Sequence, residues 1–314
     1  MNLNENSHLK ASIISRFHDE GFYMAGTARA AFLQNESEQL KQWIGLSYNA
    51  EMTWLANSQE KRADPRLLLD GAKTVITGLF NYYPPEQPVD STFRIAKYAL
   101  GRDYHTVVME KLKRIAAFIN ILGPYQTVTT VDSGSFMDKP WAMKCGLGWI
   151  GKNGLLINRE KGSFFFIGSI ITNLELEPDI ASLEHCGNCT LCMDACPTKA
   201  IVMPGVIDAR KCIAYQTIEQ KPDFTADEIG QTGNWIFGCD VCQDVCPYNR
   251  KAEPHNCSDF SLNPVLKSMT DEDWRNLDEP QFNALFSQTT LKRTGFKRVL
   301  RNIMNRPNKQ SSCR

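Results

Sequence analysis

The fold of the middle third of the chain is decided by two stretches, CGNCTLCMDACP at residues 186–197 and CDVCQDVCP at residues 239–247. The first stretch spaces its cysteines as C-x2-C-x2-C-x3-C and follows the last one with proline. The second repeats the ending C-x3-C-P, and a single cysteine, Cys212, stands between the two stretches. Eight of the eleven cysteines therefore fall between Cys186 and Cys246, a density that predicts metal ligation in a chain of this length.

This spacing is typical of proteins that bind two [4Fe–4S] clusters. In such runs three thiolates wrap one iron–sulfur cube, while the cysteine before proline ligates the other cube. We therefore assign Cys186, Cys189, Cys192 and Cys246 to a first cluster, and Cys196, Cys212, Cys239 and Cys242 to a second. Paired C-x2-C units also bind zinc, but a four-cysteine run that ends in Cys-Pro and is repeated crosswise has no simple zinc counterpart.

The rest of the composition indicates a soluble protein of the cytoplasm. The chain is long and begins with the polar MNLNENSHLK, without an apolar run and a cleavage site, so a secreted disulfide scaffold is not expected. Its most apolar stretch, Ser163–Thr172, is too short to span a bilayer. We expect no membrane association and a monomer. Cys257 and Cys313 fit no ligand spacing and are expected to be ordinary thiols.

Outside the cysteine region, the hydrophobic pattern predicts helices alternating with buried strands. Helices are expected at residues 8–20 and 107–122, and strands at Thr74–Phe80, Thr127–Val131 and Phe164–Ile171. The expected fold class is α/β, with α+β as the alternative. The expected domains are a ligand-binding α/β domain at 1–180, a ferredoxin-like double-cluster domain at 181–250, and a helical C-terminal segment at 251–314, which includes a helix over Leu291–Ile303.

Charge is balanced overall but uneven along the chain. There are 35 basic and 35 acidic residues, yet no acidic residue follows Glu279. The basic residues of this tail are Lys292, Arg293, Lys297, Arg298, Arg301, Arg306, Lys309 and Arg314. The tail is either a solvated helix face or a surface that binds phosphate groups.

A glycine-rich segment, VDSGSFMDKPWAMKCGLGWIGKNGLLI at Val131–Ile157, follows one of the predicted strands. Its closely spaced glycines would let the backbone approach a large planar or phosphate-bearing ligand, and Lys152 and Asn153 add donors. The alternative is a turn-rich connection. The segment lacks the G-x-G-x-x-G spacing of a dinucleotide site.

Several motifs together resemble the epoxyqueuosine reductase family. They are KRADPRLLLDGAKTVI at 61–76, KYALGRDYH at 97–105, CGLGWIGKN at 145–153, the first cysteine run, and GCDVCQDVCPYN at 238–249. The resemblance extends in order over about residues 10–300. It implies an oxidoreductase that reduces epoxyqueuosine to queuosine at the wobble position of tRNA, using cobalamin bound by the first domain and two [4Fe–4S] clusters.

The resemblance also implies a proton donor. Removal of the epoxide oxygen needs two electrons, which the clusters can supply singly to cobalt, and a proton. The family's proposed donor is an aspartate after the strand that precedes the glycine loop, and Asp132 matches it. A free aspartate has a pKa of about 3.9, so we expect an apolar, cofactor-covered pocket to raise the pKa of Asp132. Alternatively, Asp132 is a helix or turn cap.

Further residues are implied to line the cobalamin and substrate cleft. They are Arg62, Asp64, Lys97, Tyr98, Tyr104, Cys145, Gly148, Gly151, Lys152, Asn153, Gln216, Thr217, Asp240, Val241 and Asp244. Each also has a structural alternative, such as an Asp-Pro turn, a core tyrosine, a small buried thiol or a solvated lysine. The chain departs from the family at Ser135 and Asp138, where a proline and a glutamate are usual.

The implied partners are tRNA and a low-potential electron donor that the sequence does not identify. A single-stranded anticodon base can enter a pocket while basic side chains hold the backbone, and the tail from Gln281 is the first candidate for that role. Lys199, Arg210 and Lys211 are further candidates. Two other functions stay open: an electron carrier that docks a partner enzyme, and a cobalamin-dependent enzyme that acts on a halogenated small molecule, as reductive dehalogenases do.

Overall fold

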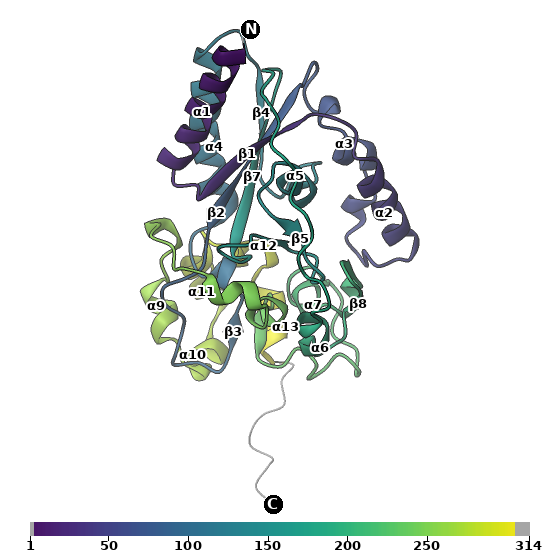
Figure 1. Cartoon of the computed structure of the whole chain (residues 1–314). Coiled ribbons are helices and arrows are strands. Elements are labelled where there is room, and N and C mark those ends of the chain that lie inside the picture. Colours follow the sequence, from purple (N-terminus) through teal and green to yellow (C-terminus); the bar gives the residue numbers. More distant parts are fainter. Residues whose placement is uncertain (1–2, 305–314) are drawn as a thin grey trace, which may run out of the picture.

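The computed structural model describes residues 3–304 (Figure 1). Its central element is a four-stranded antiparallel sheet in the order β1-β2-β7-β4. The strands are β1 (Met24–Arg29), β2 (Thr74–Asn81), β4 (Thr127–Thr130) and β7 (Phe165–Thr172). The longest pairing joins β2 to β7, from Thr74 opposite Thr172 to Asn81 opposite Phe165. Predicted strands at 74–80, 127–131 and 164–171 thus form the sheet, and β1 adds a strand that was not expected.

Strand β2 is central because its side chains are apolar on both faces. Ile76 and Phe80 point to one face and pack in the same core as Phe17. Val75 and Leu79 point to the other face and pack in a second core with Trp141. The alternation follows from the two-residue period of a strand, and it places a hydrophobic core on each side of the sheet.

Helices cover both faces of this sheet, as Figure 1 shows. One face carries α1 (Leu3–Asp19) and α4 (Tyr104–Ile121), where the sequence predicts helices at 8–20 and 107–122. On the other side lie α2 (Gln34–Gly45), α3 (Gln59–Ala63) and α5 (Asp138–Lys144). Helix α4 begins after Asp103, whose carboxylate accepts from the backbone N–H of His105, a usual N-cap.

The cysteine region contains only short elements. They are α6 (Leu191–Ala195), β8 (Ile201–Met203), β9 (Val206–Ile207), α7 (Ile213–Ile218), β10 (Trp235–Phe237) and α8 (Val241–Asp244). Strand β10 pairs in parallel with β3 (Arg94–Ile95), and the glycine-rich segment forms a small hairpin of β5 (Trp149–Ile150) and β6 (Leu156–Ile157). The cysteine region is therefore joined to the first part of the chain by backbone hydrogen bonds.

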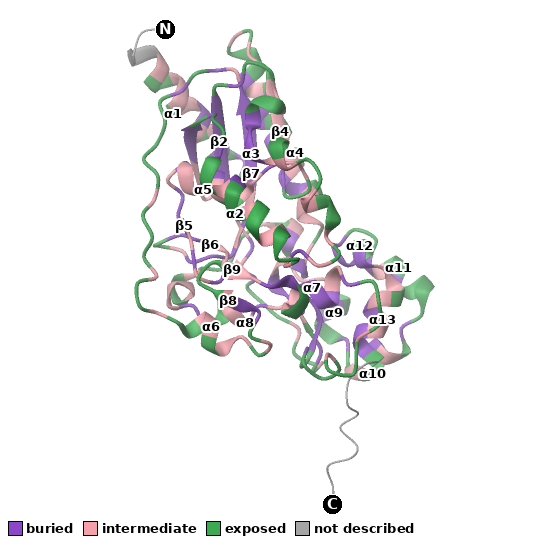
Figure 2. Ribbon diagram, turned by 90° about the vertical axis from the view of Figure 1, so that its right-hand side faces the viewer, coloured by how far each residue is buried: buried purple, intermediate pink, exposed green. Residues whose placement is uncertain are grey.

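The C-terminal part adds a third core, buried among short helices (Figure 2). Its helices are α9 (Pro264–Ser268), α10 (Asp271–Asn276), α11 (Glu279–Phe286), α12 (Leu291–Thr294) and α13 (Phe296–Met304). The single helix predicted over 291–303 is wrong in one respect. Gly295 has φ +80°, a left-handed conformation that ends α12 and lets α13 start in a new direction.

Single turns of 3₁₀ helix connect these elements. They are η1 (Thr53–Leu55), η2 (Pro65–Leu67), η3 (Lys97–Ala99), η4 (Ala209–Lys211), η5 (Pro247–Lys251) and η6 (Ser258–Phe260). Over residues 3–304, none of the helices combines the length and the apolar composition that crossing a membrane requires.

The fold class is mixed α and β, with helices at the C-terminal end, as predicted. All pairings in the main sheet are antiparallel, so the α+β alternative describes the strand arrangement better than α/β does. The division at 1–180, 181–250 and 251–314 remains a prediction. One core joins Phe93 and Ala99 of the first part to Ile236 and Phe282 of the other two.

Candidate active site

Asp132 lies two residues after the end of β4, in a cavity of about 190 Å³ that is lined by residues from separate parts of the chain. Among them are Tyr98, Asp103, Tyr104, His105, Glu219 and Arg293. The backbone of Asp132 has φ +50°, a left-handed conformation that residues other than glycine, asparagine and aspartate seldom adopt. Such strain is concentrated at functional sites, and here it turns the chain at the end of the strand.

Two side chains of α4 hydrogen-bond to the same carboxylate oxygen of Asp132. The Tyr104 hydroxyl donates to Oδ2 over 2.7 Å, and Nε2 of His105 lies 3.2 Å from this oxygen. Nδ1 of the same imidazole lies 2.7 Å from Oδ1 of Asp103. Asp103, His105 and Asp132 thus form a carboxylate–imidazole–carboxylate chain. The ring of Tyr104 is fixed by stacking on His105 and Phe166, with centroids 4.1 and 4.2 Å away.

The protein groups around Asp132 lower its pKa, and the rise expected of a cofactor-covered pocket stays a prediction. Burial among protein groups pushes the pKa upward, but the hydrogen bonds from His105 and Tyr104 outweigh it and hold the pKa below the ordinary value. The side chain is also 57% exposed toward the cavity, so water reaches the carboxylate even though protein surrounds it. Asp132 is therefore a carboxylate near neutral pH.

The pKa of the His105 imidazole shifts in the opposite direction. Burial alone would lower its pKa, but the hydrogen bonds to Asp103 and Asp132 outweigh burial and raise the pKa to about 9. His105 is therefore protonated near neutral pH. The site holds a proton on the imidazole, in contact with the carboxylate of Asp132.

The loop after Asp132 carries a second acid. Burial, helped by the charge of Asp132, raises the pKa of Asp138 to about 8, and Oδ1 of Asp138 is buried without a hydrogen-bond partner among the described residues. Arg62 donates from Nη1 to the carbonyl of Gly134 over 3.1 Å, and its Nε is also buried without a partner in the described part of the chain. Arg62 and Asp138 thus bring unsatisfied polar atoms to the loop that carries Asp132.

The structure brings Cys246 to the thiols at the start of the first cysteine run. Burial raises the pKa of Cys246, and the nearby Cys186 and Cys189 raise it further. Cys186 and Cys189 raise the pKa of Cys192 in the same way, again after burial. These four thiols are the set that the predicted first cluster requires.

The other four thiols lie near one another, and Cys192 of the first set also lies near Cys242. Burial raises the pKa of Cys239 to about 12, with further contributions from Cys212 and Cys196. Burial also raises the pKa of Cys242, and Cys212, Cys239, Cys192 and Cys196 raise it further. In the described residues, no three His, Cys, Asp or Glu side chains converge as a single metal ion would need.

The glycine-rich hairpin contacts both cysteine loops. Nε1 of Trp149 donates to Sγ of Cys186 over 3.4 Å, and Nζ of Lys152 donates to the carbonyl of Gly187. Nδ2 of Asn153 donates to the carbonyl of Cys242 over 3.3 Å. The polar side chains predicted to meet a cofactor here are thus engaged with the cysteine loops.

Glycine is required within this hairpin. A Cβ on Gly148 would lie 2.2 Å from the carbonyl oxygen of Ile157, and the backbone has φ +155°. A Cβ on Gly151 would lie 2.4 Å from the Ile157 side chain. The close packing of the hairpin on itself therefore explains these two glycines without any ligand.

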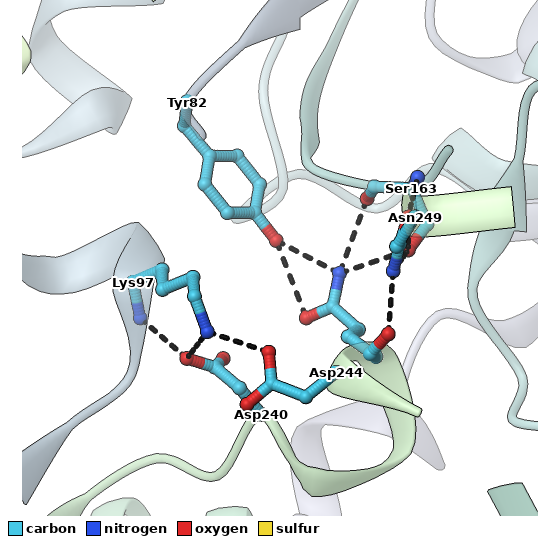
Figure 3. A network of polar contacts seen from close by, with 7 residues as sticks. Tyr82, Lys97, Ser163, Asp240, Asp244 and Asn249 are labelled. Atoms are coloured by element: carbon cyan, nitrogen blue, oxygen red, sulfur yellow. Dashed lines mark hydrogen bonds and ion pairs between the residues drawn. The ribbon is translucent and has the colours of Figure 1, made fainter. Parts of the chain in front are cut away.

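A buried polar network ties the second cysteine loop to the first part of the chain (Figure 3). The backbone N–H of Lys97 donates to Oδ2 of Asp240 over 2.8 Å, and Nζ lies 2.6 Å from Oδ1 of Asp244. Gln243 donates to the Tyr82 hydroxyl and to Ser163. The side chain of Lys97 is only 8% exposed, so it neutralises two acids that flank Cys242.

The remaining cofactor candidates differ in where they lie relative to the Asp132 cavity. Tyr98 lines the Asp132 cavity, and Gln216 is buried with Oε1 unpaired among the described residues. Thr217 bonds within the core, where it donates to Ile213 and accepts from Gly238, and Val241 packs beside Ala96.

Two candidates are engaged elsewhere. Asp64 caps η2 and binds Arg66 through two hydrogen bonds. The structure does not bring Cys145 to the cavity, because its thiol is buried and donates to Val75 of β2.

The basic tail is divided between structural and exposed residues. Arg298 and Arg301 donate to backbone carbonyls of residues 216–222, so they hold α13 against α7. Lys292, Arg293 and Lys297 are exposed, and Arg293 reaches the Asp132 cavity while paired with Glu219. Arg306, Lys309, Cys313 and Arg314 lie outside the described residues. Of the other basic candidates, Lys199 donates to Asp194 and Arg210 to Asp208, and Lys211 flanks Cys212.

Sequence reasoning missed several residues of the cavity. Asp103 and His105 stand on either side of Tyr104 within the motif GRDYH, so their position beside a candidate was visible. Glu219 follows at far greater sequence separation, and no local pattern connects it to Asp132. Arg293 was named as part of the basic tail, but its place in the Asp132 cavity was not expected.

Comparison with known proteins agrees with these features. Residues 185–249 match the family described as "4Fe-4S double cluster binding domain", and residues 62–133 match "Epoxyqueuosine reductase QueG, DUF1730". The chain is 46% identical over 284 residues to an epoxyqueuosine reductase of Cellulophaga algicola, covering 90% of this chain and 93% of that protein. It is 46% identical over 285 residues to one of Leadbetterella byssophila, with the same coverage.

A solved structure has the same fold. An epoxyqueuosine reductase crystallised with a tRNA-Tyr epoxyqueuosine-modified stem loop superimposes with a TM-score of 0.88 at 28% identity, covering 95% of this chain and 80% of that one.

Proposed function

The chain belongs to the epoxyqueuosine reductase family of oxidoreductases, and we propose that it reduces epoxyqueuosine to queuosine at the wobble position of tRNA, with Asp132 as the proton donor. The observation that carries this proposal is the hydrogen-bonded group formed by Asp132, His105 and Tyr104. It presents a carboxylate, exposed to a cavity, that is in contact with a proton held on an imidazole.

The proton balance of the reaction gives this group its role. Removing an epoxide oxygen consumes two electrons, and the oxygen leaves as hydroxide after one protonation or as water after a second. Asp132 is ionised in the resting site, so it must first take a proton before it can give one. The imidazolium of His105, 3.2 Å away, can pass that proton to Oδ2. Asp103 then stabilises His105 in either protonation state by fixing its orientation.

The residues present fit the two cofactors. Eight cysteines in two groups supply the ligands of the two [4Fe–4S] clusters, which provide electrons one at a time. Arg62, which contacts the Asp132 loop at Gly134, and Gln216, one helical turn after Cys212, each carry a buried polar atom without a partner among the described residues. The amide groups around a cobalamin ring could satisfy Arg62 Nε and Gln216 Oε1. We propose that these residues, with Tyr98, hold cobalamin, which would supply a cobalt centre for transferring the electrons to the substrate.

The exposed part of the basic tail supports the proposal that the substrate is an RNA. Lys292, Arg293 and Lys297 are exposed beside the cavity or on the helix that follows it. Such side chains can hold the phosphates of a stem loop while one base enters the cavity. The related protein crystallised with a modified tRNA stem loop is consistent with this arrangement.

A reconstitution experiment tests the proposal. The purified protein, loaded anaerobically with iron, sulfide and cobalamin, is mixed with an anticodon stem loop carrying epoxyqueuosine and with dithionite. Mass spectrometry of the RNA should show the loss of one oxygen atom, and no change in a stem loop with guanine at that position. Omission of cobalamin should abolish the reaction. Protein that holds about eight irons and bound corrinoid yet leaves the epoxide intact would contradict the proposed activity.

The same preparation tests the electron-carrier alternative. A carrier that only docks a partner enzyme would form both clusters but would bind no corrinoid after gel filtration. The visible spectrum of the filtered protein distinguishes these outcomes before substrate is added.

A further inference from the structure

Trp149 connects the glycine-rich hairpin to the first group of cysteines. Its side chain is 2% exposed, and its indole Nε1 donates to Sγ of Cys186 over 3.4 Å. The sulfur acceptor makes this contact unusual, because a buried indole N–H more often meets a carbonyl oxygen or water. Trp43 shows that ordinary pattern, since its Nε1 donates to the carbonyl of Ile207.

The orientation of the indole is fixed from two sides. Trp149 makes edge-to-face contacts with His185 and Tyr248, each with a centroid separation of 4.9 Å. It also packs in one small core with Ile157 and Cys246, with Cys186 against it. The N–H group therefore cannot turn away from the sulfur without disturbing several buried neighbours.

The hairpin that carries Trp149 is clamped on the same cysteine turn by a second contact. Nζ of Lys152 donates to the carbonyl of Gly187, the residue after Cys186. Gly148 allows the approach, because its absent Cβ leaves room for the backbone of Ile157. Two donors from one hairpin thus meet the turn that starts with Cys186.

A hydrogen bond to a ligand sulfur changes the reduction potential of a cluster. Reduction adds one electron, and part of the added negative charge resides on the cysteine sulfurs. A fixed N–H donor stabilises the more negative state more strongly. Its presence favours the reduced cluster, and its loss favours the oxidised one.

We propose that Trp149 is a positioning residue that raises the reduction potential of the first cluster through its hydrogen bond to Cys186. This inference rests on the proposed function, because it requires Cys186 to ligate a [4Fe–4S] cluster. The step is a one-electron reduction in which the external reductant is oxidised, the cluster gains the electron, and no covalent bond forms or breaks. The hairpin of the substrate-binding part thereby sets the ease with which one of the two clusters accepts an electron.

The substitution Trp149→Phe tests this inference, because it removes the N–H and keeps an aromatic ring. Both clusters are reconstituted, and their reduced fractions are followed by electron paramagnetic resonance during an anaerobic redox titration. We expect one of the two midpoint potentials to fall, by an amount equal to about a fivefold change in the reduced-to-oxidised ratio, the effect of one typical hydrogen bond. The other midpoint and the iron content should stay unchanged.

Two control variants separate the hydrogen bond from general packing. Tyr248→Phe keeps the ring beside Trp149 and removes only the hydroxyl that donates to the carbonyl of His185. Trp274→Phe makes the same chemical change in the C-terminal core. Both should leave the two midpoint potentials at the parental values.

A second replacement protects the test against a loss of folding. If Trp149→Phe binds less iron, Trp149 is replaced by benzothienylalanine, which has the shape of tryptophan and a sulfur in place of the N–H. This protein should hold its full iron and show the same fall in one midpoint. Full iron with both midpoints unchanged, or with a rise, overturns the role of Trp149.

The outcome is separable from that of the proposed function. Failure of the parental protein to hold two clusters contradicts the proposed function. A parental protein that is active, with a Trp149→Phe variant of unchanged potentials, contradicts only the role of Trp149.

Discussion

Nε2 of His105 lies 3.2 Å from Oδ2 of Asp132, although the two residues come from a helix and from the end of a strand. The contact shifts the pKa values of the two groups in opposite directions, because each group stabilises the charged form of the other. Asp132 is held as a carboxylate and His105 as an imidazolium. The candidate proton donor is therefore a pair rather than a single acid.

Substituting Asp132→Asn should slow reduction of the epoxide by at least about 100-fold, the usual effect of losing a general acid. Asparagine tolerates the left-handed backbone of this position, so the fold and both clusters should persist. Single-turnover kinetics and iron analysis measure the two effects. The exposed Asp70→Asn serves as the control and should keep the parental rate. Parental turnover in Asp132→Asn would show that the proton comes from another group.

The rate should fall as the pH rises through about 9, because His105 then loses its proton. Its raised pKa means that the protonated form is fully present at neutral pH. Asp103→Asn removes a hydrogen bond that raises this pKa, so the fall should move toward the ordinary histidine value of about 6.5. Single-turnover rates measured from about pH 6 to about pH 10 give the pH profiles of the parental protein and of the Asp103→Asn variant. If the rate falls at the same alkaline pH in both proteins, His105 is not the group whose deprotonation causes the fall.

The crosswise ligation predicts which cysteine pairs lose iron together. Cys192→Ser combined with Cys246→Ser removes two ligands of one cluster and should cost about four irons. Cys242→Ser combined with Cys246→Ser touches both clusters and should cost about eight, although these two cysteines are neighbours in sequence. Iron analysis after anaerobic reconstitution decides between the two. Cys257→Ser is the control and should keep all of the iron. The reverse pattern, with about eight irons lost from the first double variant and about four from the second, would show that Cys246 ligates the second cluster and that the assignment is wrong.

Substituting Lys97→Met should destabilise the second cysteine loop by about 3 kcal/mol, because it leaves buried Asp240 without its cationic partner. Burial already raises the pKa of Asp240 to about 6, and loss of Lys97 should raise it further. Anaerobic urea denaturation followed by cluster absorbance measures the change. The matched control is Lys267→Met, which removes the exposed pair with Glu86 and should cost less than about 1 kcal/mol. Equal urea concentrations at half-unfolding for the two variants would contradict a structural role for the Lys97 network.

Gly148→Ala should prevent the hairpin from closing, because the added Cβ would overlap the carbonyl oxygen of Ile157 at 2.2 Å. We expect a loss of thermal stability equivalent to at least about 2 kcal/mol, together with weaker retention of the first cluster through displacement of Trp149. Gly45→Ala is the control, since a Cβ there has nothing within 4 Å and should be neutral or slightly stabilising. Differential scanning fluorimetry under argon compares the variants. Parental stability in Gly148→Ala would show that the hairpin can relax.

Sequence alone determined the features that depend on residues close together along the chain. The apolar run of β2 and the cysteine spacing both predict their structures, because strand burial and cluster ligation depend on residues a few positions apart. Strand β1 was missed because its sequence, MAGTAR, is short and weakly apolar. Asp132 could be singled out only through the family resemblance.

Tertiary structure alone decided the chemistry around these residues. The pKa of Asp132 is lowered rather than raised, because α4 brings His105 and Tyr104 to its carboxylate. Trp149 reaches Cys186 only because the glycine-rich hairpin folds onto the cysteine loop. A pKa and a reduction potential depend on which dipoles and charges surround a group, and neighbours that are distant along the chain leave no local pattern in the sequence.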